Sequence, residues 1–228
     1  MNDFLMGLLL GKRGGGGGGG GGGTDLSGAI VDRSIFGAYS NSEITKVGKY
    51  AFRYCTNLTS VNLPAVTVVD EYAFSDSGLI AASMPNVVTI GLHAFQNCAA
   101  LTGLDMSKVK TVDGSAFRGS GITQAIMPAL ETIGNSYLFT NCTSLTVVDF
   151  GESLTAIPNY TFYGCTAFER LIIRNPSSVV TGSAQMFQNA TIPNIYVPDD
   201  LVDSYKTTTY WKYSSVAEKI VGLSQLPT

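Results

Sequence analysis

The sequence predicts a repeat solenoid, an elongated stack of similar units that each contribute one short parallel β-strand. Three observations predict it: a phenylalanine that returns at intervals of 21 to 25 residues, an apolar pair before it, and a strand-like apolar pattern after it. A unit of about 22 residues cannot bury an apolar face alone, so neighbouring units must stack and share one core. We count about seven units, and such a stack needs a cap at each end.

The repeated phenylalanine sets the register of the units. The apolar pair lies upstream with a spacing of three, as in Ile44 and Val47. Downstream, apolar residues occupy the positions of Leu58, Val61 and Leu63, and the last three positions of this pattern alternate as in a half-buried strand. A proline often closes the strand and stops it from lengthening. The phenylalanines are Phe52, Phe74, Phe95, Phe117, Phe139, Phe162 and Phe187.

Changes in composition divide the chain into segments. Ten consecutive glycines at residues 14–23 form a flexible linker with a root-mean-square span of roughly 15 to 20 Å. An apolar segment at residues 1–13 precedes it, and the predicted N-terminal cap at 24–43 follows. The solenoid occupies 44–198. The repeat period is then lost, and 199–228 are predicted to form a helical C-terminal cap.

Composition and charge exclude several functions. Charged residues make up 14% of the 228 residues, the net charge is −3, and the basic residues are scattered, so we expect no nucleic-acid partner. The apolar stretch at residues 4–10 is much shorter than the ~20 residues that span a bilayer. No basic stretch precedes it and no small-residue cleavage site follows it, so no signal peptide is recognised. An all-apolar helix there would instead need a partner.

The four cysteines occupy one repeated position, three residues after the phenylalanine. Units without cysteine carry Ser77, Ser120 or Ala190 there, which indicates a small interior slot. Stacked units separate most of these cysteines by two rungs, so converging metal ligands are not expected. Adjacent rungs bring one pair near enough for a disulfide in principle, but we predict buried thiols. The cysteines are Cys55, Cys98, Cys142 and Cys165, and the last two form the adjacent pair.

A second repeated position, two residues before the phenylalanine, is rich in tyrosine and holds the single histidine, His93. Mutual packing of these side chains is the favoured interpretation, and stacking on sugar rings is the alternative. A catalytic histidine needs a nucleophile and an orienting carboxylate around it, and neither is indicated. No hydrolase, zinc-protease or calcium-loop motif is present, so we predict neither an enzyme nor a cofactor.

Two stretches, "VGKYAFRYCTNLTSVNLPAV" and "IGLHAFQNCAALTGLDMSKV", show the repeat in its fullest form. Their pattern resembles the BspA-like (Treponema-type) leucine-rich repeat family, over about residues 44–198. The resemblance implies a curved leucine-rich-repeat solenoid that binds proteins or glycans, as is common on bacterial surfaces and in bacteriophage. It therefore implies a cell surface or a virion as the location, although the sequence shows no signal peptide.

Strand alternation predicts which side chains face outward. If Val61 and Leu63 point inward, Asn62 points outward, and stacking aligns it with one residue of each later strand. This column is Asn62, Ser83, Asp105, Ile126, Asp149, Ile172 and Tyr196, and a second runs beside it through Ser60, Ala81, Gly103, Gln124, Val147, Arg170 and Asn194.

The later strands gain charged and aromatic side chains, which often dominate binding energy. We therefore predict a non-enzymatic recognition module that binds protein or glycan through this sheet face. The alternative is a structural appendage of a larger assembly, such as a phage virion, docked by residues 1–13. The predicted contact residues are Asp105, Asp149, Glu169, Arg170 and Tyr196.

Overall fold

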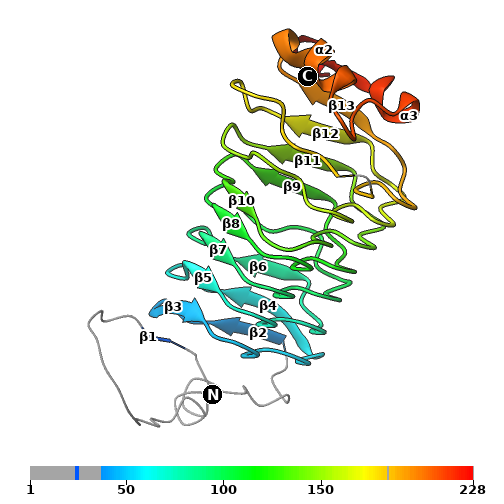
Figure 1. The fold of residues 1–228 in the computed structure, drawn as a ribbon. Helices are drawn as coiled ribbons and strands as arrows, with labels where there is room; N and C mark the ends of the chain where they lie inside the picture. Colours follow the sequence, from blue (N-terminus) through cyan, green and yellow to red (C-terminus); the bar gives the residue numbers. More distant parts are fainter. Residues whose placement is uncertain (1–23, 26–36, 184, 228) are drawn as a thin grey trace, which may run out of the picture.

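The computed structural model describes residues 24–25, 37–183 and 185–227, and it shows an elongated stack of parallel strands (Figure 1). The predicted repeat solenoid is confirmed, with successive turns about 22 residues apart. Residues 37–40, within the predicted N-terminal cap, form a strand that pairs in parallel with residues 58–62 of the solenoid. The predictions for residues 1–13 and 14–23 lie outside the described residues.

One column of strands contains the predicted strand segments that follow the phenylalanines. It is formed by a three-stranded sheet, β2-β4-β6, and a five-stranded sheet, β14-β13-β12-β11-β9. The predicted register is confirmed, because Asn62 pairs with Ser83, and Asp149 pairs with Ile126 and Ile172. The strands are β2 (Gly37–Ser40), β4 (Leu58–Asn62), β6 (Ala81–Ser83), β9 (Gln124–Met127), β11 (Val147–Phe150), β12 (Arg170–Ile173), β13 (Asn194–Val197) and β14 (Ile220–Gly222).

The two sheets of this column are separated by one irregular rung. There the only described strand-like contact with the preceding unit is an isolated parallel bridge from Ala82 to Leu104. Gly103 and Asp105 flank Leu104, and both residue types are depleted in strands. The column therefore continues through this rung without a full strand.

The units also contribute a second, shorter strand, which was not predicted from the sequence. It forms from the apolar pair upstream of the phenylalanine and builds a six-stranded parallel sheet, β1-β3-β5-β7-β8-β10. Most of these strands have two residues, too few to show alternation in the sequence. The strands are β1 (Thr24–Asp25), β3 (Ile44–Val47), β5 (Val68–Val69), β7 (Thr89–Ile90), β8 (Thr111–Val112) and β10 (Thr132–Ile133).

A continuous ladder of phenylalanine rings fills the core between the strand columns. Each ring stacks on the same residue of the next unit, from Phe52 to Phe187, with centroids 5.0 to 6.0 Å apart. The rings are 0 to 9% exposed. Stacked aromatic pairs add about 0.5–1.5 kcal/mol beyond area burial, so the ladder stabilises every interface between units.

The cysteines fill the predicted interior slot, and all four are buried without forming a disulfide. In the units that lack cysteine, the chain is one residue shorter and its backbone runs very close to the preceding unit. A Cβ on Gly78 would lie 2.0 Å from the Thr56 carbonyl oxygen, and one on Gly121 would lie 2.2 Å from that of Ala99. Glycine is therefore required at these two positions, because the backbones of adjacent units leave no room for a Cβ atom.

The residues after 198 close the end of the stack (Figure 1). The Trp211 side chain is buried, and its Nε1 donates a hydrogen bond of 2.8 Å to the Val180 carbonyl oxygen. The Tyr205 hydroxyl accepts one of 2.9 Å from the Val180 amide. Besides helices, this segment contributes strand β14, which pairs with β13. The helices are η1 (Asp199–Leu201), α2 (Val202–Thr207), α3 (Ser214–Ala217) and η2 (Leu223–Gln225).

Within the described ranges, no helix is long and apolar enough to cross a membrane.

Candidate binding surfaces

The first candidate surface is a trough on the outward face of β2, β4, β6 and β9. Two adjoining hollows form it, the larger about 520 Å³ in volume, and both are lined in part by Thr102 and Gly103. Small, exposed side chains make its floor, and Ile80 and Ile126 stand out of it with 52% and 42% of their surface exposed. The outward floor residues include Ser60, Asn62, Ala81, Ser83 and Gln124.

Asp105 is the carboxylate of this trough. It lies in the second hollow and is exposed. Its Oδ1 accepts a hydrogen bond of 3.0 Å from the Ser107 amide, and the bond with Ser107 lowers the pKa of the Asp105 carboxyl below its usual value. Among its described lining residues, the trough therefore presents one ionised group beside neutral hydroxyls and amides.

The later strands of the same face are covered by the chain's own C-terminal residues. The side chains of Val147, Ile172 and Tyr196 are only 5 to 6% exposed and pack together beneath Val221, Leu223 and Leu226. The expectation that Tyr196 presents an exposed ring is therefore wrong. The physical reason is that β14 extends the sheet and η2 folds back over its outward face, which the loss of repeat period did not reveal.

Asp149 is also engaged within the molecule. Its two carboxylate oxygens accept hydrogen bonds of 2.8 Å each from Nε and Nη2 of Arg174. The Asp149 side chain is 14% exposed, so this bidentate ion pair occupies the carboxylate. Glu169 is exposed and Arg170 is half-buried. Strands β11, β12 and β13 bring Asp149, Arg170 and Tyr196 together, whereas Asp105 lies apart in the trough.

The second candidate surface is the row of residues two positions before the phenylalanines from Phe52 to Phe162, here named the tyrosine row. The predicted mutual packing is confirmed: the Tyr50 and Tyr72 ring centroids lie 5.3 Å apart, and those of Tyr72 and His93 lie 4.6 Å apart. Every member from 50 to 160 adopts a positive φ of 55 to 72°, which is unusual for tyrosine. The row consists of Tyr50, Tyr72, His93, Ser115, Tyr137 and Tyr160.

At the N-terminal end of the tyrosine row, the side chain of Arg53 packs against the tyrosine rings. The Arg53 guanidinium carbon lies 4.5 to 5.4 Å from the ring centroids of Tyr50, Tyr54 and Tyr72. Further along, a hollow of about 530 Å³ opens beside the row instead, at Tyr137 and Tyr160. This hollow was not predicted from the sequence. The feature of the sequence that could have indicated it is the serine at position 115, where the row otherwise has an aromatic residue.

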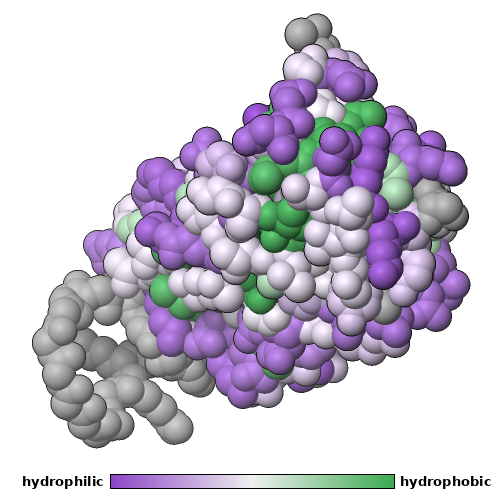
Figure 2. Space-filling view, turned by 45° about the horizontal axis from the view of Figure 1, so that its top comes forward, coloured by the Kyte–Doolittle hydropathy of each residue, from purple (hydrophilic) through white to green (hydrophobic). Residues whose placement is uncertain are grey.

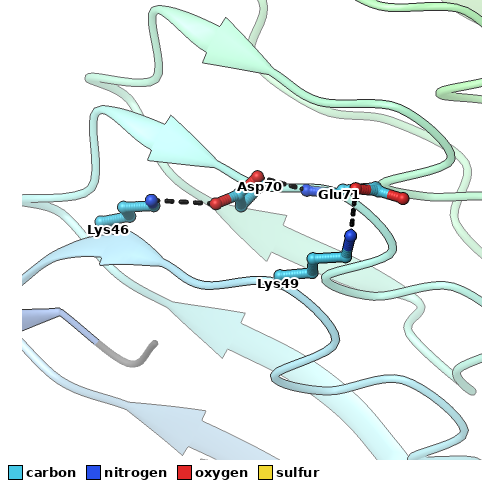
Figure 3. A network of polar contacts seen from close by, with 4 residues as sticks. All are labelled: Lys46, Lys49, Asp70 and Glu71. Atoms are coloured by element: carbon cyan, nitrogen blue, oxygen red, sulfur yellow. Dashed lines mark hydrogen bonds and ion pairs between the residues drawn. The ribbon is translucent and has the colours of Figure 1, made fainter. Parts of the chain in front are cut away.

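Ion pairs near the start of the solenoid form another polar cluster (Figure 3). Lys46 Nζ lies 2.9 Å from Asp70 Oδ2, and Lys49 reaches Glu71 from the neighbouring turn. These side chains are partly or well exposed, so solvent screens the ion pairs and each contributes little to stability. The cluster therefore links two adjacent units without forming a reactive site.

Hydrophilic and near-neutral residues cover most of the side shown in Figure 2, and hydrophobic ones form limited patches among them. Across residues 24–25, 37–183 and 185–227, no group of three or more histidine, cysteine, aspartate or glutamate side chains could hold a metal ion.

Parallel strands at a period of about 22 residues, a phenylalanine ladder and a capped end define a leucine-rich-repeat solenoid. Residues 38–146 and 131–220 match the BspA type leucine rich repeat region, in six copies, and the chain belongs to this family. No curated protein matches the chain.

Two solved bacterial structures are similar to the chain. A leucine-rich repeat protein from Bacteroides ovatus is 23% identical, with a TM-score of 0.53 over 72% of this chain and 48% of that one. A leucine rich cell surface protein from Faecalibacterium prausnitzii is 21% identical, with a TM-score of 0.42 over 84% of this chain and 60% of that one. The chain thus spans about half to three fifths of these proteins, and the first likeness supports the fold.

Proposed function

We propose that this protein is a non-enzymatic recognition module that binds a protein or glycan through the exposed sheet face of its solenoid. The observation that carries the proposal is the trough on β2, β4, β6 and β9, where two adjoining hollows open on the outward face. The other half of that face is occupied by the chain's own C-terminal residues. The proposed contact surface is therefore the trough, with Asp105 as its charged residue.

The lining of the trough suits an extended partner. Small side chains let a partner approach the sheet closely, and hydroxyl and amide groups such as those of Ser60 and Asn62 can exchange hydrogen bonds with it. The exposed side chains of Ile80 and Ile126 add apolar contacts. Glu169 and Arg170 are proposed to extend the polar contact beyond β9. Asp149 and Tyr196 would act only by shaping the neighbouring surface.

Gly103 offers a way to test the trough without disturbing the fold. A Cβ at Gly103 would meet no atom within 4 Å, so Gly103→Tyr should project a ring into the trough. We expect glycans from an array, or peptides selected from a display library on the wild-type protein, to lose binding to this variant. A matched control is Thr132→Tyr, which adds the same ring at an exposed position of the other strand column. Equal binding by both variants would refute the trough as the contact surface.

The alternative function, a structural appendage, is favoured by one sequence observation. A short apolar segment at residues 1–13 is joined to the solenoid by ten glycines, which suits a docking peptide on a flexible tether. Under this proposal, deletion of residues 1–13 leaves the solenoid folded but abolishes its incorporation into an assembly or oligomer. Unchanged sedimentation and co-purification after the deletion would rule the proposal out.

A further inference from the structure

The tyrosine row contains a single gap, at Ser115. Rings stack on both sides of it: Tyr72 on His93 at 4.6 Å, and Tyr137 on Tyr160 at 4.8 Å with planes 5° apart. The phenylalanine ladder beneath is unbroken there, with centroid distances of 5.4 and 5.7 Å to and from Phe117. The rung is therefore present, and only its outer ring is missing.

The gap uncovers one aromatic face. In the part of the chain that the structure describes, Tyr160 is the one ring stacked on Tyr137, and Tyr137 is 43% exposed. Ser115 is 7% exposed and lies at the bottom of the adjacent hollow. Two rungs separate the His93 and Tyr137 positions, roughly 10 Å at the ~4.8 Å spacing of strands. The hollow is lined by Tyr137 and Ser115, and His93 is not among its lining residues, so a ligand ring in it would stack on Tyr137.

A positive charge stands on the same rung. The Arg118 amide donates a hydrogen bond of 3.1 Å to the Ser115 carbonyl oxygen, so its side chain starts beside the gap. Arg118 is exposed, and among the described residues its guanidinium makes no ion pair and no hydrogen bond. Among the residues that the structure describes, no carboxylate lines the hollow. The hollow therefore favours an anion over a cation.

Neutral hydrogen-bonding groups complete the lining. Thr140, Asn141 and Gln188 border the hollow, together with the hydroxyl-bearing rings of Tyr160 and Tyr163. Tyr163 meets Tyr160 edge to face, at 6.1 Å and 66°, and its hydroxyl accepts a hydrogen bond of 2.7 Å from Asn189 Nδ2. An aromatic side chain fixed in position, with amide and hydroxyl groups around it, is suited to binding a polyhydroxylated ring.

We propose that this hollow is a second binding site, for an acidic sugar residue of a glycan. The sugar ring stacks on the free face of Tyr137 in the gap above Ser115, and its carboxylate pairs with the Arg118 guanidinium, whose planar fork matches a carboxylate. This site is separate from the trough. The N-terminal end of the tyrosine row cannot act in the same way, because Arg53 already occupies it.

Saturation-transfer NMR of the full chain with D-glucuronic acid and with methyl glucoside tests the proposal. We expect saturation transfer from the protein to glucuronic acid, and a weaker saturation-transfer signal for methyl glucoside. Ser115→Tyr should abolish the transfer, because the new ring fills the gap. Tyrosine already adopts this backbone conformation at Tyr50, Tyr72, Tyr137 and Tyr160, so the melting temperature should not fall.

Three further variants separate the site from its surroundings. Arg118→Gln should weaken binding of the acidic sugar roughly tenfold, as expected for loss of a charge-assisted hydrogen bond, and should leave the neutral sugar unaffected. Tyr50→Ala, which removes a ring from the filled end of the row, and Gly103→Tyr, which blocks the trough, should both bind normally. No transfer to either sugar, or full transfer in Ser115→Tyr, would overturn the proposal. If Arg118→Gln still binds glucuronic acid more strongly than methyl glucoside by the same factor, the assignment of an acidic sugar is overturned.

Discussion

The Cys98 Sγ atom donates a hydrogen bond of 3.0 Å to the carbonyl oxygen of Phe74, one unit earlier in the chain. The same contact recurs from Cys142 to Phe117, at 2.9 Å, and from Cys165 to Phe139, at 3.1 Å. The repeated cysteine therefore joins adjacent units through the interior. A sulfur atom suits the slot because it fills space and satisfies a buried carbonyl group.

The first prediction is that these thiols destabilise the fold at alkaline pH. Burial raises the pKa of the Cys98 thiol from 9.0 to about 11 and that of Cys142 to about 12. A raised pKa in the folded state means that the unfolded chain loses its proton first. Stability is then complete below about pH 9 and falls as pH rises toward 11 and 12, by up to ~1.4 kcal/mol per pH unit for each thiol.

Urea unfolding midpoints between pH 8 and 11 check this prediction, with Cys98→Ser/Cys142→Ser as the control that removes both titrations. The double variant should show a shallower decline. A thiol reagent at pH 8 should also react with these cysteines only as the protein unfolds. Equal pH slopes for both proteins would contradict the assignment of the thiols as the titrating groups.

The second prediction concerns the short units. Gly78→Ala should destabilise the protein by several kcal/mol, on the order of the largest single-residue effects, because the new Cβ would lie 2.0 Å from the Thr56 carbonyl oxygen. Gly103→Ala is the matched control, since its Cβ would meet nothing within 4 Å. Chemical denaturation measures both. Similar midpoints would show that the units can move apart to accept a methyl group.

The third prediction tests the phenylalanine ladder. Phe95 is fully buried between the rings of Phe74 and Phe117, so Phe95→Ala should cost ~3–5 kcal/mol. Tyr72→Ala, in the partly exposed tyrosine row, should cost clearly less. Denaturant midpoints of the two variants measure this difference. Equal losses of stability would mean that the tyrosine row stabilises the units as strongly as the core does.

The repeat itself explains why so much of the fold was predictable. One phenylalanine position and one alternating pattern, applied to each unit, fixed the column that aligns Asn62 with Ser83 and Asp149 with Ile172. The second strand column was missed because two-residue strands carry no periodicity. The burial of Tyr196 was not predicted, because the residues that cover it lie outside the repeat, where no neighbouring unit indicates their position. Likewise, the gap at Ser115 becomes a hollow only when its neighbours are stacked in three dimensions.

The last prediction concerns Tyr196, whose ring is 6% exposed beneath the C-terminal residues. Tyr196→Ala should lower stability by ~2–4 kcal/mol, because it leaves a cavity between the sheet and Leu223 and Leu226. Asn194→Ala, on the same strand but exposed, should change stability by less than about 0.5 kcal/mol. Deletion of residues 223–228 should reproduce the loss and expose an apolar patch that binds a hydrophobic dye. Denaturation midpoints and dye fluorescence measure these effects. If Tyr196→Ala instead keeps the wild-type midpoint and loses ligand binding, the C-terminal residues do not cover this face in solution, and the contact surface extends to the late strands.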